Sequence, residues 1–181
     1  LTDLKDTLGI INLELDLACI KSLKGQNFEA IIIYKTVLKK AQITNDDKFL
    51  LADTNYNLGR ALMKMEKYEE ALGYIQNATR LAEEIKYNLI LGLGYRSMGR
   101  IYVKLNIEKE GIAYYNKAIA ILNQDNLVHY SLETSNNLAT DMMSIGNFDI
   151  AEKIAKQTII KAQKSKFKSS ESSALTILGE I

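Results

Sequence analysis

The chain lacks proline and tryptophan and contains one cysteine and one histidine in 181 residues. Without proline, no position carries the residue that most strongly interrupts a helix. Cys19 cannot form an internal disulfide, and with only His129 available beside it the chain has too few His and Cys ligands for a zinc site. These absences exclude a disulfide scaffold and a His/Cys metal centre, so we expect no metal and no cofactor.

The chain also lacks an excess of either charge, because it contains 23 Lys and Arg residues and 22 Asp and Glu residues. A formal net charge of +1 creates no overall field that would attract nucleic acid or an anionic membrane. No apolar run approaches the roughly 18 residues that a membrane-spanning helix needs. With 47% hydrophobic and 25% charged residues, the composition is that of a folded domain. We therefore expect a cytoplasmic domain that binds neither nucleic acid nor membrane through this segment.

The chain is rich instead in helix-forming residues arranged in a repeat. Small residues recur every 40 or 41 positions, and a second small residue follows twelve positions after the first in each complete copy. Two antiparallel helices can approach to about 8–10 Å only where small side chains lie at the crossing. The pattern therefore predicts units of two antiparallel helices joined by a short turn. The first small positions are Ala18, Gly59, Gly99, Ala139 and Gly179, and the second are Ala30, Ala71, Gly111 and Ala151.

The repeat predicts one domain made of stacked units, because a single hairpin cannot bury its apolar stripe alone. We interpret the sequence as a fragment of a longer array. Apolar residues of the last unit, such as Leu175 and Ile181, have no second helix to cover them, which predicts self-association through the ends. The units expected are residues 11–50, 52–91, 92–131 and 132–171, a partial unit at 172–181, and the end of a preceding unit at 1–10.

The repeated residues resemble the tetratricopeptide repeat. Its pattern of Leu-Gly-x-x-Tyr, then Ala-x-x-x-Phe, then Ala is approximated at residues 58–62 and 71–78, and again at 98–102 and 111–118. The period is 40 or 41 where the common form has about 34, and the usual proline after the second helix is missing. This long period is similar to that of variants in bacterial signalling regulators. The resemblance implies an all-α fold, a right-handed superhelical solenoid of antiparallel helix pairs.

The same resemblance implies a binding surface, because in this family the first helix of each unit lines the concave face. A cluster of guanidinium groups there suits carboxylates, and asparagine amides suit a peptide backbone. We expect a groove for a protein or an acidic peptide. The alternative is a solvated surface whose cations pair with Asp53 or Glu133. The candidate peptide-binding residues are Tyr56, Asn57, Arg60, Lys64, Arg96, Arg100, Lys104, Asn136 and Asn137.

No combination of residues indicates catalysis. Cys19 and His129 lie too far apart in the order of the repeats to form a nucleophile and base, and the sequence has no Walker or HExxH motif. We therefore expect no enzyme but a noncatalytic scaffold that binds protein or peptide on its concave face. The alternative is a signalling-peptide sensor domain of a bacterial transcriptional or phosphorelay regulator.

Overall fold

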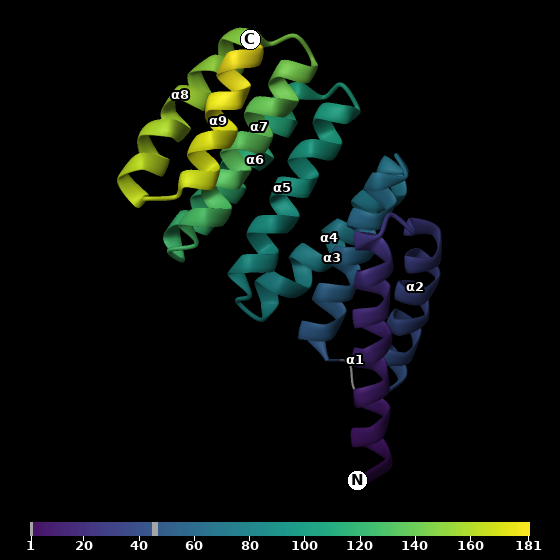
Figure 1. Ribbon diagram of the computed structural model, residues 1–181. Coiled ribbons are helices and arrows are strands. Elements are labelled where there is room, and N and C mark those ends of the chain that lie inside the picture. The colour runs from purple at the N-terminus through teal and green to yellow at the C-terminus, as the bar shows by residue number, and fades with distance from the viewer. Residues whose placement is uncertain (1, 45–46) are drawn as a thin grey trace. The chain divides into compact units, whose positions relative to one another are not determined.

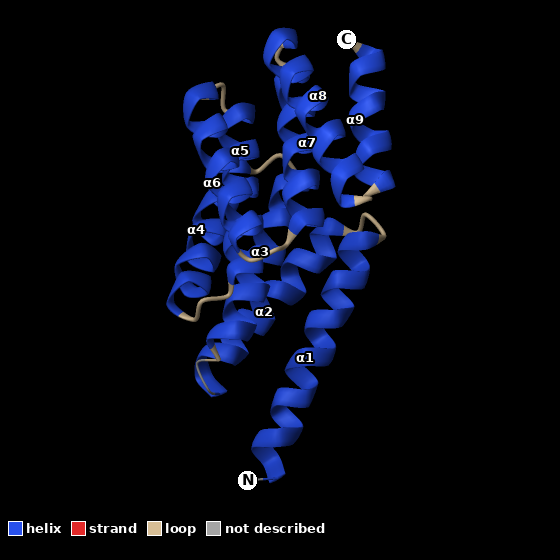
Figure 2. Ribbon diagram, turned by 90° about the vertical axis from the view of Figure 1, so that its left-hand side faces the viewer, coloured by secondary structure: helices blue, strands red, loops and turns tan. Residues whose placement is uncertain are grey.

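A computed structural model describes residues 2–44 and 47–181. Within these ranges the chain forms nine helices and no strand (Figure 2). The predicted all-α class is confirmed. Leu1 in the predicted range 1–10, and Asn45 and Asp46 in the range 11–50, lie outside the described residues. The helices are α1 (Thr2–Leu23), α2 (Asn27–Thr44), α3 (Lys48–Lys64), α4 (Tyr68–Glu84), α5 (Asn88–Lys104), α6 (Glu108–Gln124), α7 (Val128–Ser144), α8 (Phe148–Ser165) and α9 (Lys168–Glu180).

The long period of the sequence arises from two half-repeats of equal length. The helices from α3 to α7 are all equally long, and each is followed by a three-residue turn that leads into the next helix. One pair of helices with its two turns therefore spans one full period. The boundaries between the predicted units were counted from the small residues, and they fall inside α3, α5, α7 and α9. In the structure, one helix pair ends and the next begins in the turns between helices. Residues 2–10 form the first turns of α1, which continues without interruption to Leu23.

The turns share one backbone conformation. Residues with positive φ recur every 20 positions from Glu66 to Lys166, and only Gly146 among these six is a glycine. After α3, the amide of Lys67 donates to the carbonyl of Leu62 and the amide of Glu66 to that of Met63, both at 3.0 Å. These two bonds satisfy carbonyls at the end of the helix and define a Schellman motif. From α3 to α8 the chain thus reverses direction after each helix without proline.

The structure divides into two compact units, residues 1–94 and 95–181, with the boundary inside α5. In unit 1, α1 packs against α2, α2 against α3, and α3 against α4 (Figure 1). In unit 2, α7 packs against α6, α8 and α9. One core of unit 2 contains Val103, Tyr115, Leu138, Met142 and Ala151, all buried.

Small residues allow close helix crossings, as the sequence predicted. A Cβ atom added at Gly59 would lie 2.6 Å from Ile75 Cδ1 and 3.2 Å from the carbonyl oxygen of Ala71. In unit 2, a Cβ atom at Gly99 would lie 2.6 Å from Tyr115 Cδ2 and 3.0 Å from the carbonyl oxygen of Gly111. Real Cβ atoms do not approach other atoms this closely, so the close approach of α3 to α4 and of α5 to α6 depends on these glycines.

Candidate peptide-binding surfaces

The predicted binding residues of unit 1 lie on α3, and most of them make contacts within the unit. Tyr56 is buried, and the guanidinium carbon of Arg60 lies 5.5 Å from the centroid of its ring. Lys64 Nζ donates to the carbonyl oxygen of Ser22 at 2.9 Å, and burial lowers the pKa of Lys64, as does nearby Arg60. A cation is favourable at this C-terminal end of α1. Asn57 is half-buried on the same helix.

In unit 2, facing side chains of α5 and α7 form a ladder of charged and amide groups. Arg96 Nη1 lies 3.4 Å from Glu133 Oε2, and Arg100 Nε donates to Asp141 Oδ2 at 3.1 Å. Asn137 lies on the same face of α7, one helical turn from each of these acids. We refer to Arg96, Arg100, Glu133, Asn137 and Asp141 as the α5–α7 ladder.

Asp141 is the buried anchor of the ladder. Its side chain is 4% exposed, whereas that of Arg100 is 38% exposed. The hydroxyl of Tyr115, which comes from α6, donates to the same carboxylate oxygen as Arg100. A carboxylate removed from water is tolerated only when charge and hydrogen bonds compensate for lost hydration, and these two donors supply both. Asp141 therefore holds the guanidinium of Arg100 in a fixed position at the edge of the buried region.

Both donors to Asp141 keep their protons at neutral pH. Burial raises the pKa of Tyr115 well above its usual range, and the negative charge of Asp141 raises it further. Burial opposes the charged form of Arg100, but its interactions with Tyr115 and Asp141 outweigh this effect, so the pKa of Arg100 is raised. An arginine has five N–H donors, and the bond to Asp141 uses only the one on Nε.

The other two predicted residues of unit 2 have different surroundings. Asn136 is buried, and its Nδ2 donates to the carbonyl oxygen of Ser170 at 2.9 Å, which ties α7 to α9. Lys104 is exposed in the last turn of α5, one turn beyond Arg100. Among the described residues, Lys104 has no ion-pair partner. The structure therefore gathers Arg96, Arg100 and Asn137 on one face, with Lys104 at its end.

Sequence reasoning did not identify Asp141 and Tyr115 as part of this surface. A signal was present, because the positions that correspond to Asp141 in the two preceding first helices hold Ala61 and Ile101. An acid at an apolar position of a repeat indicates a buried partner. Arg60 belongs to unit 1, whereas Arg96 and Arg100 belong to unit 2. The expectation that these three arginines line one groove therefore stays a prediction.

Residues 2–44 and 47–181 contain no group of three or more His, Cys, Asp and Glu side chains placed to hold a metal ion. In the same part of the chain, no helix is both long enough and apolar enough to cross a membrane.

Comparisons with known proteins agree with the repeat pattern. Residues 50–124 match the tetratricopeptide repeat family. Human tetratricopeptide repeat protein 29 is 27% identical over 103 residues, which are 56% of this chain and 21% of that protein. The chain thus aligns with about a fifth of the length of this curated relative.

Solved structures show the same fold over nearly the whole chain. The crystal structure of aspartyl phosphate phosphatase F from Bacillus subtilis has a TM-score of 0.83 at 14% identity and covers 93% of this chain and 44% of that one. A Rap protein complexed with competence and sporulation factor has a TM-score of 0.64 at 16% identity and covers 94% and 52%. These likenesses identify the fold as a solenoid of helix pairs. The repeated residues and the match over residues 50–124 show that this part of the chain carries tetratricopeptide repeats.

Proposed function

We propose that the chain is a noncatalytic protein-binding module whose α5–α7 ladder binds an acidic peptide segment of a partner. The observation that carries this proposal is the position of Arg100. Its Nε is held by the buried carboxylate of Asp141, while its side chain remains partly exposed. An arginine fixed in this way loses little conformational freedom when it binds a second carboxylate through its remaining donors.

The charges around the ladder favour an acidic partner. Arg96, Arg100 and Lys104 contribute three positive charges, and Glu133 and Asp141 contribute two negative charges. Lys104 has no carboxylate partner in the described part of the chain and can attract a second acidic side chain. The amide of Asn137 offers a donor and an acceptor to the peptide backbone between them.

Fluorescence anisotropy with labelled hexaglutamate and hexalysine peptides tests the proposal. We expect hexaglutamate to bind and hexalysine not to bind, with weaker binding at high salt because the site charges are partly exposed. Arg100→Ala removes a charged hydrogen-bond donor, which corresponds to a loss of affinity of about tenfold or more.

The matched control is the double variant Lys164→Ala with Lys168→Ala, which removes two cations outside the ladder and is expected to leave the affinity unchanged. Equal binding of the two peptides, or full affinity in Arg100→Ala, would contradict the proposed site. Thermal melts of each variant separate loss of binding from loss of folding.

A second candidate function is a signalling-peptide sensor segment of a larger regulator. It is supported by likeness of fold to the Rap protein, whose structure contains competence and sporulation factor. Titration of the chain with that factor tests it. Saturable binding that hexaglutamate does not displace would favour the sensor function over the acidic-segment site, and absence of binding would remove this candidate.

A further inference from the structure

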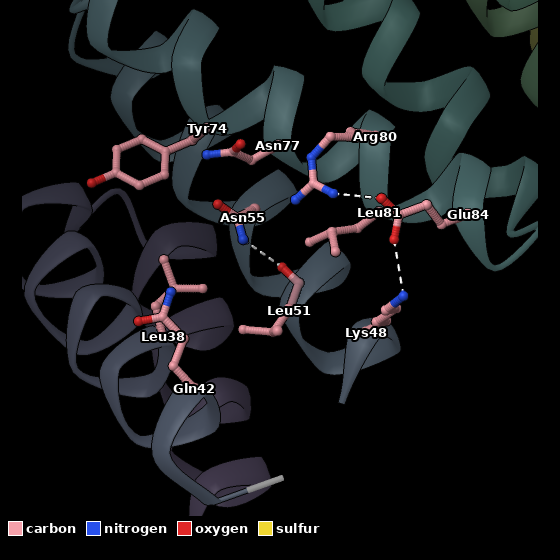
Figure 3. Close-up of a pocket in the computed structure, with 10 residues that line it drawn as sticks. All are labelled: Leu38, Gln42, Lys48, Leu51, Asn55, Tyr74, Asn77, Arg80, Leu81 and Glu84. Atoms are coloured by element: carbon pink, nitrogen blue, oxygen red, sulfur yellow. Dashed lines mark hydrogen bonds and ion pairs between the residues drawn. The ribbon is translucent and has the colours of Figure 1, made fainter. Parts of the chain in front are cut away.

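A cleft in unit 1 lies apart from all the predicted peptide-binding residues. Its volume is about 500 Å³, within the range of roughly 300–1,000 Å³ typical of ligand pockets. Figure 3 shows side chains of α2 on one side, side chains of α4 on the other, and those of α3 between them. The cleft therefore lies between α2 and α4, which are the second helices of two consecutive repeats, and α3 lies between them.

The deepest part of the cleft is apolar. Leu51 and Leu81 are buried, and Leu38 is half-buried beside them. These three leucines come from α3, α4 and α2. Burial of an apolar group of a ligand against these leucines removes apolar surface from water, which favours binding. The floor thus suits one aliphatic side chain.

Three amide side chains border this floor, one from each helix: Gln42, Asn55 and Asn77. Asn55 Nδ2 donates to the carbonyl oxygen of Leu51 at 2.7 Å, so its Oδ1 is the atom left to accept a bond from a ligand. In Figure 3 the Asn77 amide lies near Asn55, and Tyr74 lies beyond it. An extended peptide backbone alternates donors and acceptors, which primary amides can match.

Among the residues that line the cleft, the charged ones lie together at one end and comprise two cations and one carboxylate. Lys48 Nζ lies 3.0 Å from Glu84 Oε2, and Arg80 Nη1 lies 2.5 Å from Glu84 Oε1. The hydrogen bond from Lys48 lowers the pKa of Glu84, and Arg80 lowers it further, so this carboxylate stays ionised. Two cations sharing one carboxylate leave one positive charge at this end, which favours an anionic group on the ligand.

The repeat does not require these polar residues. In unit 2, 80 positions along the chain, Lys48 corresponds to Val128, Arg80 to Ile160, and Glu84 to Lys164. The same helix framework forms there without the charged set. The charged set of Lys48, Arg80 and Glu84 is therefore a property of this cleft and not of the helix packing.

We propose that this cleft is a second binding site, for an extended peptide segment that presents an aliphatic side chain next to a carboxylate. The aliphatic side chain lies on the three leucines, the backbone bonds to the amides, and the carboxylate lies at Lys48 and Arg80. This site is in unit 1 and uses none of the residues of the α5–α7 ladder, so the two sites can be tested separately.

NMR titration of the full chain with the blocked peptide Ac-Ala-Leu-Ala-Glu-NH₂ tests the proposal, with the Gln analogue as the neutral comparison. We expect the side-chain amide signals of Asn55 and Asn77 to shift, with a Kd of about 1 mM or tighter and weaker binding of the neutral peptide. The signal of Asn137 reports separately on the ladder. Shifts confined to Asn137, or equal affinity for both peptides, would overturn the cleft site.

Variants of two exposed residues of the cleft test whether it prefers an anionic or a cationic ligand. Arg80→Ala is expected to weaken binding of the acidic peptide by about tenfold. Glu84→Gln removes the negative charge between the two cations, so the acidic peptide should bind several-fold more tightly. Weaker binding in Glu84→Gln would show that the cleft selects a cation and would overturn the proposal. Gln157→Ala, at the position in α8 that corresponds to Asn77, is the matched control and should leave the affinity unchanged.

Discussion

At position 141 the repeat places a residue in the packing between helices, and the corresponding positions hold Ala61 and Ile101. Asp141 is nearly as buried as these residues, with 3% of its surface exposed. The carboxylate is retained there because Tyr115 and Arg100 both donate to it. Its effect on the surface is indirect, since it fixes an arginine that remains partly exposed.

We predict that Asp141→Ala destabilises the chain by about 2–3 kcal/mol, because it leaves Arg100 and Tyr115 without their acceptor. The figure lies below that for a fully buried pair because solvent screens the partly exposed arginine. Urea denaturation followed by circular dichroism measures the change. Glu133→Ala, which removes the half-exposed acid of the ladder, is the control and should cost less than about 1 kcal/mol. Equal losses in the two variants would show that Asp141 is not the anchor.

A second prediction at this scale concerns alkaline pH. Burial raises the pKa of Tyr34 and Tyr115 far above 10, with further raising by Cys19 and by Asp141 respectively. The unfolded chain loses these protons near pH 10, whereas the folded chain retains them. Stability from this source is therefore complete below about pH 10 and decreases above it, by up to about 1.4 kcal/mol per pH unit for each tyrosine.

Thermal melts between pH 8 and 11 measure this effect, and Tyr115→Phe should make the decrease less steep. Tyr114→Phe, at the half-buried neighbouring position, is the control, because burial differs between the two phenols. A pH profile of Tyr115→Phe that matches the unsubstituted chain would contradict the assignment.

At the scale of helices, the sequence predicted the crossings because the small residues recur at fixed positions. It also predicted the short turns between helices, but not their left-handed backbone conformation, because most residues with positive φ are not glycine. Lys86 and Asn106 adopt φ values of 57° and 61°, which side chains with a Cβ atom disfavour. The geometry of the Schellman motif, and not local preference, sets the conformation there.

Two glycines in helices should respond to alanine in opposite directions. Gly99→Ala places a Cβ atom 2.6 Å from Tyr115 and 3.0 Å from the backbone of Gly111, so we expect a loss of about 1–3 kcal/mol. Gly73→Ala, on the exposed face of α4 with no atom within 4 Å, should gain about 0.5–1 kcal/mol because alanine favours the helix. Chemical denaturation of the two variants measures both. Changes of the same sign would contradict the crossing of α5 and α6.

At the scale of the whole molecule, the sequence predicted the fold because each copy of the repeat imposes the same packing. It identified Arg96, Arg100 and Asn137, and it named Glu133 as an alternative partner of the cations, which is the residue that pairs with Arg96. It could not predict Asp141 as the buried acceptor, or the cleft, because Arg100 and Asp141 lie 41 positions apart and come from different copies. It also assigned residues 1–10 to the end of a preceding unit, whereas residues 2–10 form the first turns of α1. Within the last helix, Ile177 is 5% exposed and packs with Ala139 and Ala155.

The sequence predicted self-association from exposed apolar residues of the last unit, such as Leu175 and Ile181, and the structure shows a further exposed apolar surface on α1. Ile10, Leu13, Leu17 and Ile20 lie on one face of this helix and are 54%, 70%, 47% and 49% exposed. Shifted by 41 positions, they correspond to Leu51, Thr54, Leu58 and Ala61 of α3, which are 5%, 0%, 0% and 0% exposed. The helix face that is buried in α3 is therefore exposed to solvent in α1.

We predict that a second copy of the chain covers this face of α1, because burying an exposed leucine is worth about 1.5–3 kcal/mol and the face is continuous over three turns. Sedimentation velocity over a range of concentrations should show reversible association. Leu13→Glu with Leu17→Glu should abolish it, since charge in the interface opposes burial. Ile160→Glu, at an exposed apolar residue of α8, is the control and should leave association unchanged. A monomer at all concentrations, or association that persists in the double variant, would show that copies do not meet through α1.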